Sequence, residues 1–385
     1  MKKIIMVLMM ALFTNTVCVY AEEMKIGAAS AVLMDADTGR VLWDRKSDVP
    51  LPVASTTKIM TAILAIESQR LDETAVVTSR AASSPEVKLG LRSGEEYKLG
   101  DLLYPLMLQS SNDAAVVIAE YLGGSVEGFA KMMNAKAQEL GAKNTKFVTP
   151  NGLDKDDNHS TAYDMALITA YALNNKDFVE LINTKEYAFS SINKSRNFTA
   201  YNKNRLLNEY EGALGVKTGF TGKAGQCFVG AAQRDGVRLI SVVLASGWGT
   251  AGKQQKWIDT KRLLNYGFDN YHKEKIINKE TEIGTVNVLY SKEKKVMVQT
   301  CEDGFAMINN EEKNSLKTSA RLIEAVEAPV NKGQVLGEIT VSTSTGEVLF
   351  ISELTAKDDV FRHDLRTSAK KTINLWLNSQ FKCIL

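Results

Sequence analysis

Residues 52–67 read PVASTTKIMTAILAIE. Apolar side chains recur at helical spacing through the second half of this stretch, and a proline leads it. Since proline is tolerated at the start of a helix but not inside one, the pattern predicts a helix that begins at or near Ser55. Side chains three positions apart share a helix face, which brings Lys58 next to the Ser55 hydroxyl. The stretch therefore predicts a nucleophilic serine with a lysine as its base.

A lysine can serve as that base only in its uncharged form. Burial or a nearby cation must lower its pKa, and Lys217 is a candidate for the cation. The spacing alone is weak evidence, because Ser-x-x-Lys also begins at residues 191, 291, 368 and 379. Ser55 is favoured because it alone opens a strongly apolar helix.

Two further short motifs supply polar groups that suit such a site. The triplet Ser-Ser-Asn at 110–112 follows an apolar segment, and its hydroxyl and amide suit proton relay and peptide binding. A helix N-cap is the alternative interpretation. Lys-Thr-Gly occurs once, at 217–219, where the cation and hydroxyl suit a carboxylate and the glycine permits close approach of a substrate backbone. A plain surface strand end is the alternative there.

Other chemistries lack their sequence signatures. The three histidines form no His-Glu-x-x-His pair, and neither a Gly-x-Ser-x-Gly elbow nor a phosphate-binding Gly-x-x-x-x-Gly-Lys-Ser/Thr loop occurs. Charged residues make up 24% of the 385 but nearly cancel at net +2, so no nucleic-acid partner is expected. We expect no metal and no cofactor.

Hydrophobic periodicity and turn residues outline two domains. Strands are predicted at 31–34 and 40–43, and at 226–233 and 237–245 joined through Asp235-Gly236. Helices are predicted at 99–109, 112–122, 126–140, 161–173 and 257–266. This order predicts an α+β domain over 22–272. Short alternating runs such as 285–289 and 295–298 predict a small all-β domain over 275–355.

The two ends of the chain resemble targeting segments. Residues 1–21 combine two lysines, a short apolar run and small residues before a cleavage point, which predicts a secretory signal peptide. Residues 360–385 place apolar side chains on one stripe and basic ones elsewhere, which predicts a basic amphipathic helix. We expect this helix to associate with a membrane surface; a terminal helix docked on the β domain is the alternative.

Taken in chain order, the three motifs resemble the Ser-x-x-Lys, Ser-x-Asn and Lys-Thr-Gly set of penicillin-binding proteins and serine β-lactamases. Longer stretches at 52–62, 151–165 and 217–225 resemble the low-molecular-mass D-alanyl-D-alanine carboxypeptidases of peptidase family S11, the penicillin-binding protein 5 type. The resemblance implies a serine β-lactamase/transpeptidase-like α+β domain, an antiparallel sheet flanked by helices, followed by the small all-β domain and the C-terminal amphipathic helix.

The resemblance also implies a role for each motif residue. Ser55 is expected to be the acylated nucleophile, Lys58 its base and Ser110 the proton relay. Lys217 and Thr218 are expected to attract the terminal carboxylate, and Asn112 to hold the peptide. The backbone N–H groups of Ser55 and Phe220 are expected to form the oxyanion hole. The expected substrate-binding residues are Asn112, Lys217, Thr218, Gly219 and Phe220.

The implied activity is removal of the terminal D-alanine from peptidoglycan pentapeptide stems, with β-lactam antibiotics as covalent inhibitors, at the outer face of the cytoplasmic membrane or in the cell wall. The alternatives are a β-lactamase, a transpeptidase, a D,D-endopeptidase on cross-linked peptidoglycan and a non-catalytic cell-wall binding homologue.

Two positions depart from the pattern. Phe220 stands where some relatives have histidine, and 246–256 offers only Lys253 and Lys256 where some have an arginine for the carboxylate.

Overall fold

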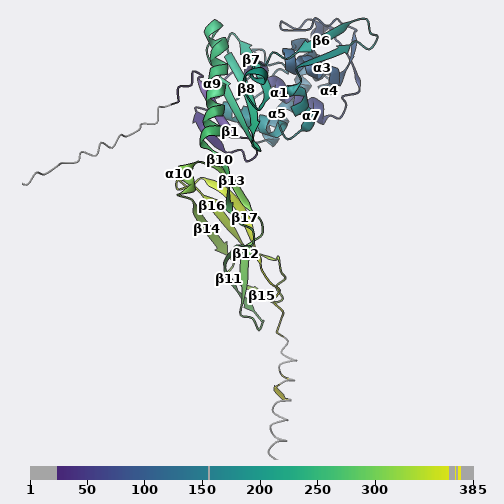
Figure 1. The fold of residues 1–385 in the computed structure, drawn as a ribbon. Helices are drawn as coiled ribbons and strands as arrows, with labels where there is room; N and C mark the ends of the chain where they lie inside the picture. The colour runs from purple at the N-terminus through teal and green to yellow at the C-terminus, as the bar shows by residue number, and fades with distance from the viewer. Residues whose placement is uncertain (1–23, 155–156, 364–368, 370–371, 374–385) are drawn as a thin grey trace, which may run out of the picture.

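The computed structural model describes residues 24–154, 157–363, 369 and 372–373, which form two units in succession (Figure 1). The first unit is built from helices around a sheet, and the second consists almost entirely of strands. The expected signal peptide at 1–21, and most of the segment at 360–385 expected to form the amphipathic helix, lie outside the described residues.

A five-stranded antiparallel sheet organises the first unit, in the order β2-β1-β9-β8-β7. Both expected hairpins are confirmed, because β1 pairs with β2 and β8 pairs with β9. The second turn contains Asp235 and Gly236, which both have positive φ, as a tight hairpin requires. The strands are β1 (Ser30–Asp35), β2 (Val41–Arg45), β7 (Ala213–Thr221), β8 (Gly225–Arg234) and β9 (Val237–Leu244).

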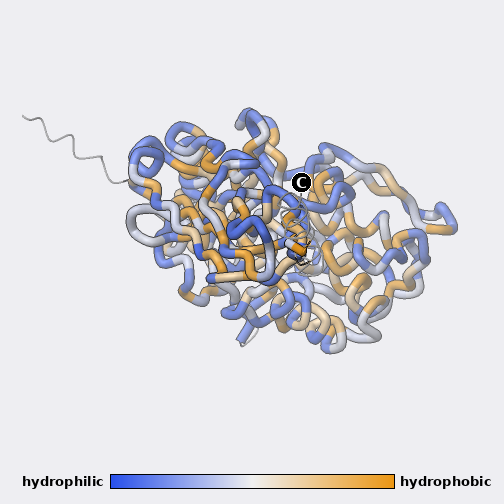
Figure 2. The backbone as a smooth tube through the Cα atoms, turned by 90° about the horizontal axis from the view of Figure 1, so that it is seen from below, coloured by the Kyte–Doolittle hydropathy of each residue, from blue (hydrophilic) through white to orange (hydrophobic). Residues whose placement is uncertain are grey.

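Helices cover both faces of this sheet. The long helix α9 packs on one face, and α1 and α6 lie on the other with further helices beyond them (Figure 1). Residues 58–66 of α1 are all buried between the sheet and the other helices, which explains why this helix has almost no polar face. Figure 2 shows apolar stretches gathered inside and hydrophilic loops around them. The helices are α1 (Lys58–Glu67), α2 (Ser79–Ala82), α3 (Leu99–Tyr104), α4 (Asn112–Gly123), α5 (Val126–Glu139), α6 (Ala162–Ala172), α7 (Lys176–Asn183), α8 (Leu206–Glu209) and α9 (Gly249–Asn270).

Some local features differ from the sequence prediction. The helix expected at 257–266 begins earlier, at Gly249. The sequence prediction missed its first two turns because they are polar, contain glycine and show no apolar periodicity. The helix expected from Ser55 begins with a 3-10 turn, Ala54–Thr57, and the one expected at 99–109 ends in a π-helical turn, Pro105–Gln109. Two antiparallel strand pairs were not predicted. One is β3 (Thr74–Val76) with β4 (Glu96–Lys98), which α2 separates in the chain, and the other is the hairpin of β5 (Glu186–Ser190) with β6 (Asn197–Tyr201).

The second unit has its own apolar core. A six-stranded sheet runs in the order β14-β16-β17-β12-β11-β15, and β10 pairs with β13 where this unit joins the first (Figure 1). The expected strands at 285–289 and 295–298 are confirmed as parts of β11 and β12, which pair antiparallel. The elements are β10 (His272–Ile277), β11 (Glu282–Leu289), β12 (Lys295–Thr300), β13 (Gly304–Ile308), α10 (Asn310–Lys313), β14 (Lys317–Leu322), β15 (Ala325–Glu327), β16 (Val335–Ser342) and β17 (Val348–Ala356).

An arginine in the β1–β2 turn joins the two units. The Arg40 guanidinium lies 2.5 Å from Glu312 Oε1 and 2.8 Å from Glu347 Oε2, and it donates to the carbonyl of Met307. The Arg40 side chain is only 8% exposed, so its charge is largely shielded from water. Removing one partner of such a group leaves the other charges uncompensated, which is where most of the energetic cost arises.

We expect Arg40→Ala to loosen the junction between the units by about 1–3 kcal/mol, because Glu312 and Glu347 lose their cation. Small-angle X-ray scattering should then show a broader range of distances between the units. Arg70→Ala removes an exposed ion pair inside the first unit and should leave the scattering unchanged. Identical profiles for Arg40→Ala and the parent would show that this contact does not hold the units together.

Candidate active site

The Ser55 hydroxyl lies where the edge strand β7 meets the start of α1. Ser55 belongs to the 3-10 turn that leads into the helix, and Lys58 is the first helical residue. Lys58 Nζ lies 2.9 Å from Ser55 Oγ, and the Lys58 side chain is fully buried. The predicted serine and lysine are therefore in direct hydrogen-bond contact.

Two carbonyl oxygens complete the surroundings of the Lys58 amine. Nζ donates to Asn112 Oδ1 at 2.8 Å and to the backbone oxygen of Asn151 at 2.7 Å. Burial holds the pKa of Lys58 well below its ordinary value, and the charge of Lys217 lowers it further. A neutral amine has two N–H groups and one lone pair. The two carbonyl oxygens accept the N–H groups, which leaves the lone pair for the Ser55 hydroxyl proton.

Ser110 lies on the turn between the π-helical segment and α4, and Asn112 is the first residue of α4. Ser110 has a left-handed φ of +69°, which ends that segment, and it lines the same groove as Ser55. Asn112 is buried, and its Nδ2 donates to the backbone oxygen of Pro85 at 3.1 Å. The Asp113 carboxylate accepts backbone N–H groups from residues 89–91, which holds the adjacent loop against α4.

Strand β7 forms another wall of the groove and carries the Lys-Thr-Gly motif. Glycine was expected at position 219 to let the substrate backbone approach. The fold also favours glycine there, because a Cβ would lie 3.0 Å from Ser55 N and from Val53 O. Gly152 meets the same turn from elsewhere; its φ is +77°, and a Cβ would lie 1.8 Å from Ala54 O. The two glycines allow the serine-bearing turn to fit between the strand and the loop.

The motifs meet in one groove of about 220 Å³. Ser55, Ser110 and residues 217–220 line it. Lys58 contacts the Ser55 hydroxyl and Asn112 contacts the Lys58 amine, and neither of these two residues lines the groove. All eight predicted site residues are thus brought together. Lys203 in the groove wall and the Asn151 carbonyl were not predicted as site groups; no local motif marks the lysine, whereas Asn151 lies within one of the family-like stretches.

The groove carries an excess of positive charge. Burial lowers the pKa of Lys217 to about 7 and that of Lys256 to about 8, and the charges of Lys256 and Lys203 add to the effect on Lys217. The described residues that line the groove include no aspartate or glutamate. An anionic group is therefore the favoured occupant of this wall.

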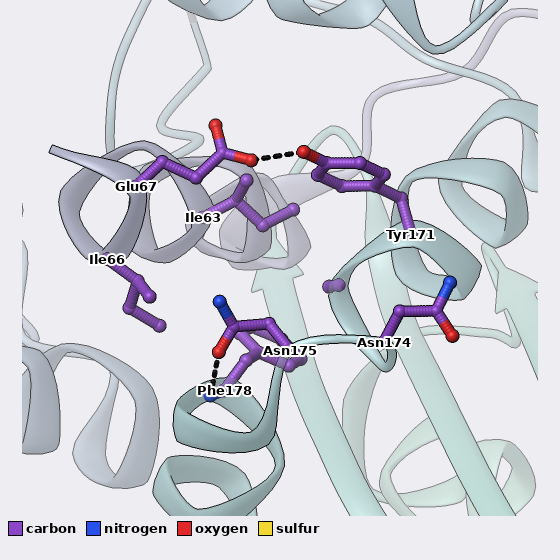
Figure 3. Close-up of a pocket in the computed structure, with 8 residues that line it drawn as sticks. Ile63, Ile66, Glu67, Tyr171, Asn174, Asn175 and Phe178 are labelled. Carbon is purple, nitrogen blue, oxygen red and sulfur yellow. Dashed lines mark hydrogen bonds between the residues drawn. The ribbon is translucent and has the colours of Figure 1, made fainter.

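A second cavity, of about 230 Å³, lies toward the other end of α1 (Figure 3). Ile63 and Ile66 of α1 and Phe178 of α7 contribute its apolar walls, and Tyr171 donates a hydrogen bond to Glu67 at its rim. The described residues around it include no serine, cysteine, histidine or lysine, so it pairs no nucleophile with a base. The groove at Ser55 is the candidate active site.

Comparisons with known proteins identify the families that this chain resembles. Residues 17–247 match the family described as D-alanyl-D-alanine carboxypeptidase, and residues 271–362 match the C-terminal domain of penicillin-binding protein 5. The D-alanyl-D-alanine carboxypeptidase DacF of Bacillus subtilis is 33% identical over 360 residues, covering 92% of this chain and 91% of the relative. DacC of Escherichia coli is 32% identical over 332 residues, covering 83% and 80%.

A solved structure shows the same architecture. The crystal structure of penicillin binding protein 5 from Haemophilus influenzae superposes with a TM-score of 0.72 at 29% identity, covering 88% of this chain and 98% of that one. The expected fold, an α+β peptidase-type domain followed by a small all-β domain, is confirmed.

We expect Lys217→Met to stabilise the protein, because the pKa of the folded lysine, about 7, lies below its ordinary value of 10.5. The unfolded chain binds this proton more tightly than the folded protein does. The unfolding free energy gained by Lys217→Met is therefore complete below pH 7 and disappears as the pH rises from 7 to 10.5. This gain in unfolding free energy should reach about 2–4 kcal/mol. Thermal unfolding at pH 6 and pH 9.5 measures it, with the exposed Lys223→Met as control. An unchanged Tm at pH 6 would contradict the expectation.

Proposed function

The chain belongs to the D-alanyl-D-alanine carboxypeptidase family, and we propose that it removes the terminal D-alanine of peptidoglycan stem peptides through an acyl-enzyme on Ser55. The observation that carries this proposal is the 2.9 Å contact between the Ser55 hydroxyl and the buried Lys58 amine, beside a groove with cationic walls. The names of the relatives describe the same activity.

Acylation begins when Ser55 Oγ attacks the carbonyl carbon of the penultimate D-alanine and Lys58 takes the hydroxyl proton. The backbone N–H groups of Ser55 and Phe220 stabilise the negative charge that develops on the carbonyl oxygen, at about 3–4 kcal/mol per donor. The tight approach of Gly219 to Ser55 N supports this pairing, because Phe220 follows directly on the same strand.

The peptide C–N bond then breaks, and the departing D-alanine amine receives a proton from Lys58 through the Ser110 hydroxyl. The stem peptide remains as an ester on Ser55. Water attacks the ester carbonyl, the C–O bond to the serine breaks, and the proton returns to Ser55 Oγ. The place of Ser110 in the groove beside Ser55 supports its role as the relay.

Asn112 has two tasks in this scheme. Its Oδ1 orients the Lys58 amine, and its Nδ2 carries two N–H groups, of which one donates to Pro85 O. We assign the other N–H to the backbone of the substrate peptide. Lys217 and Thr218 bind the terminal carboxylate, because a buried cation is compensated when an anion arrives.

β-Lactam antibiotics fit the same scheme as covalent inhibitors. A β-lactam carbonyl in the place of the scissile peptide acylates Ser55, and a carboxylate beside it meets the same cationic wall. Penicillin labelling therefore reports on the same nucleophile, base and groove as the peptidase reaction. It distinguishes the hypothesis of a catalytic protein from the hypothesis of a non-catalytic homologue.

We place the protein at the outer face of the cytoplasmic membrane or in the cell wall, peripherally attached. The signal-like sequence at 1–21 and the basic amphipathic pattern at 360–385 support this location. In the part of the chain that the structure describes, no helix combines the length and apolar character needed to cross a bilayer.

Ser55→Ala should abolish D-alanine release from diacetyl-Lys-D-Ala-D-Ala by purified residues 22–385, a loss of at least about 10³-fold, because no acyl-enzyme can form. Labelling by a fluorescent penicillin should disappear with it. Ser191→Ala is the matched control, since Ser191 also begins a Ser-x-x-Lys sequence but lies in the β5–β6 turn. It should keep both activities.

Continued release from Ser55→Ala would show that another group is the nucleophile. A parent protein that is labelled but releases no D-alanine would point to cross-linked muropeptides as the substrate. A parent protein that is neither labelled nor active would point to the non-catalytic homologue.

Deleting residues 364–385 should move the protein from the membrane to the soluble fraction, because it removes most of the basic amphipathic segment. Cell fractionation with immunoblotting measures the shift. D-alanine release from the soluble peptide should persist, since every groove residue precedes residue 257. Retention of the truncated protein at the membrane would count against the anchor.

A further inference from the structure

Large apolar side chains are exposed at the end of the second unit that lies far from the first unit. This distal tip comprises residues 289–295, at the turn between β11 and β12, and residues 361–363; Figure 1 places β11 and β15 at this end. Leu289 is 47% exposed, Tyr290 60% and Phe361 74%. Large apolar side chains that gather on a surface indicate a contact with another molecule or a membrane.

The two segments of the distal tip are fixed to each other. His363 N donates to Tyr290 O at 2.7 Å, and Ser291 forms an isolated β-bridge with Arg362. The Arg362 guanidinium lies 5.5 Å from the centre of the Tyr290 ring, which is a cation–π contact. The exposed side chains are therefore presented together by a hydrogen-bonded backbone.

The backbone of Tyr290 is in an unfavourable conformation for its side chain. Its φ is +57°, in the left-handed region that glycine and asparagine adopt far more readily than a bulky residue. A turn exposed only to water gains nothing from tyrosine at such a position. Strain of this kind is commonly retained where the side chain has a function.

The charge of the distal tip is mainly positive. Lys292, Lys294 and Lys295 are exposed, and Glu293 is the single acidic residue between 289 and 295. Anionic lipid headgroups attract lysine and arginine near a bilayer surface, and salt screens this attraction. Tyrosine suits the same boundary, because its ring is apolar and its hydroxyl is polar.

Building on the proposed peripheral location, we propose that the distal tip contacts the headgroup layer of an anionic phospholipid bilayer, as a second attachment beside residues 364–385. The basic amphipathic pattern follows directly after residue 363, so a bilayer bound by that segment lies next to the tip. The tip offers few apolar side chains. It therefore strengthens the attachment and does not replace residues 364–385.

The apolar part of the contact is tested by sedimentation of purified residues 22–385 with vesicles of phosphatidylglycerol and phosphatidylcholine. The double variant Tyr290→Ser, Phe361→Ser should bind about 10-fold more weakly or less, because it loses apolar surface that the bilayer buries. Ile351→Ser is the matched control, since Ile351 is 55% exposed but lies on β17 outside the tip. Both proteins should keep D-alanine release from a soluble peptide, because neither change touches the groove.

The charged part of the contact is tested by Lys292→Glu combined with Lys294→Glu. Binding to vesicles that contain phosphatidylglycerol should fall about 10-fold or more at low salt, and the loss should shrink at high salt. Vesicles of phosphatidylcholine alone should show little difference. Lys223→Glu reverses an exposed charge on the first unit and should leave vesicle binding unchanged.

Direct contact is measured with Tyr290→Trp in a Trp376→Phe background, because Trp376 lies in the C-terminal segment and would otherwise contribute. On vesicle binding, the emission of the new tryptophan should shift to shorter wavelength and be quenched by lipids with brominated acyl chains. Ile351→Trp in the same background should show neither effect.

Two results would overturn the inference. One is equal vesicle affinity of the parent and the Tyr290→Ser, Phe361→Ser variant. The other is unquenched emission from Tyr290→Trp on vesicle-bound protein, which would mean that water or another part of the chain covers the tip. A parent protein that binds no vesicles would refute the proposed location as well, whereas D-alanine release reports on the proposed activity independently of both.

Discussion

The active centre depends on the burial of one amine, that of Lys58. A charged lysine cannot be enclosed by apolar side chains without a large cost, so burial lowers its pKa and produces a base. The buried helix α1 provides the apolar enclosure, and the carbonyl groups of Asn112 and Asn151 accept hydrogen bonds from the Lys58 amine. Serine alone is a weak nucleophile, and in the proposed mechanism this enclosed amine activates Ser55.

The edge position of β7 explains why the groove lies where it does. The outer side of this strand faces no further strand, so the 3-10 turn with Ser55 lies beside it, with Gly219 leaving room for the turn. The serine turn, the α4 start and the strand all pack into one core, which fixes their mutual positions. The second unit follows the far end of α9, roughly 20 Å along the helix from Lys256, and the described residues that line the groove include none from that unit.

The cationic wall illustrates a conflict between stability and function. Lys217 and Lys256 lie buried beside a groove whose described lining includes no acidic residue, and this disfavours their charged forms in the free protein. Apolar residues at the same positions would make a more stable protein with no means of attracting a carboxylate. Binding sites commonly retain such unfavourable groups because the ligand compensates them.

Local sequence is sufficient for the features that depend on close neighbours in the chain. The spacing of Ser55 and Lys58 and the Asp235-Gly236 turn act within a few residues, so periodicity and turn chemistry reveal them. The motif residues were expected to meet because their order resembles a known family, and the structure places them around one groove. The Asn151 carbonyl that accepts from Lys58, 93 residues away, was visible only after folding. The same holds for the contact of Gly219 with the serine turn and for the reach of Lys256 from α9, because packing between distant segments creates these contacts and no local pattern encodes them.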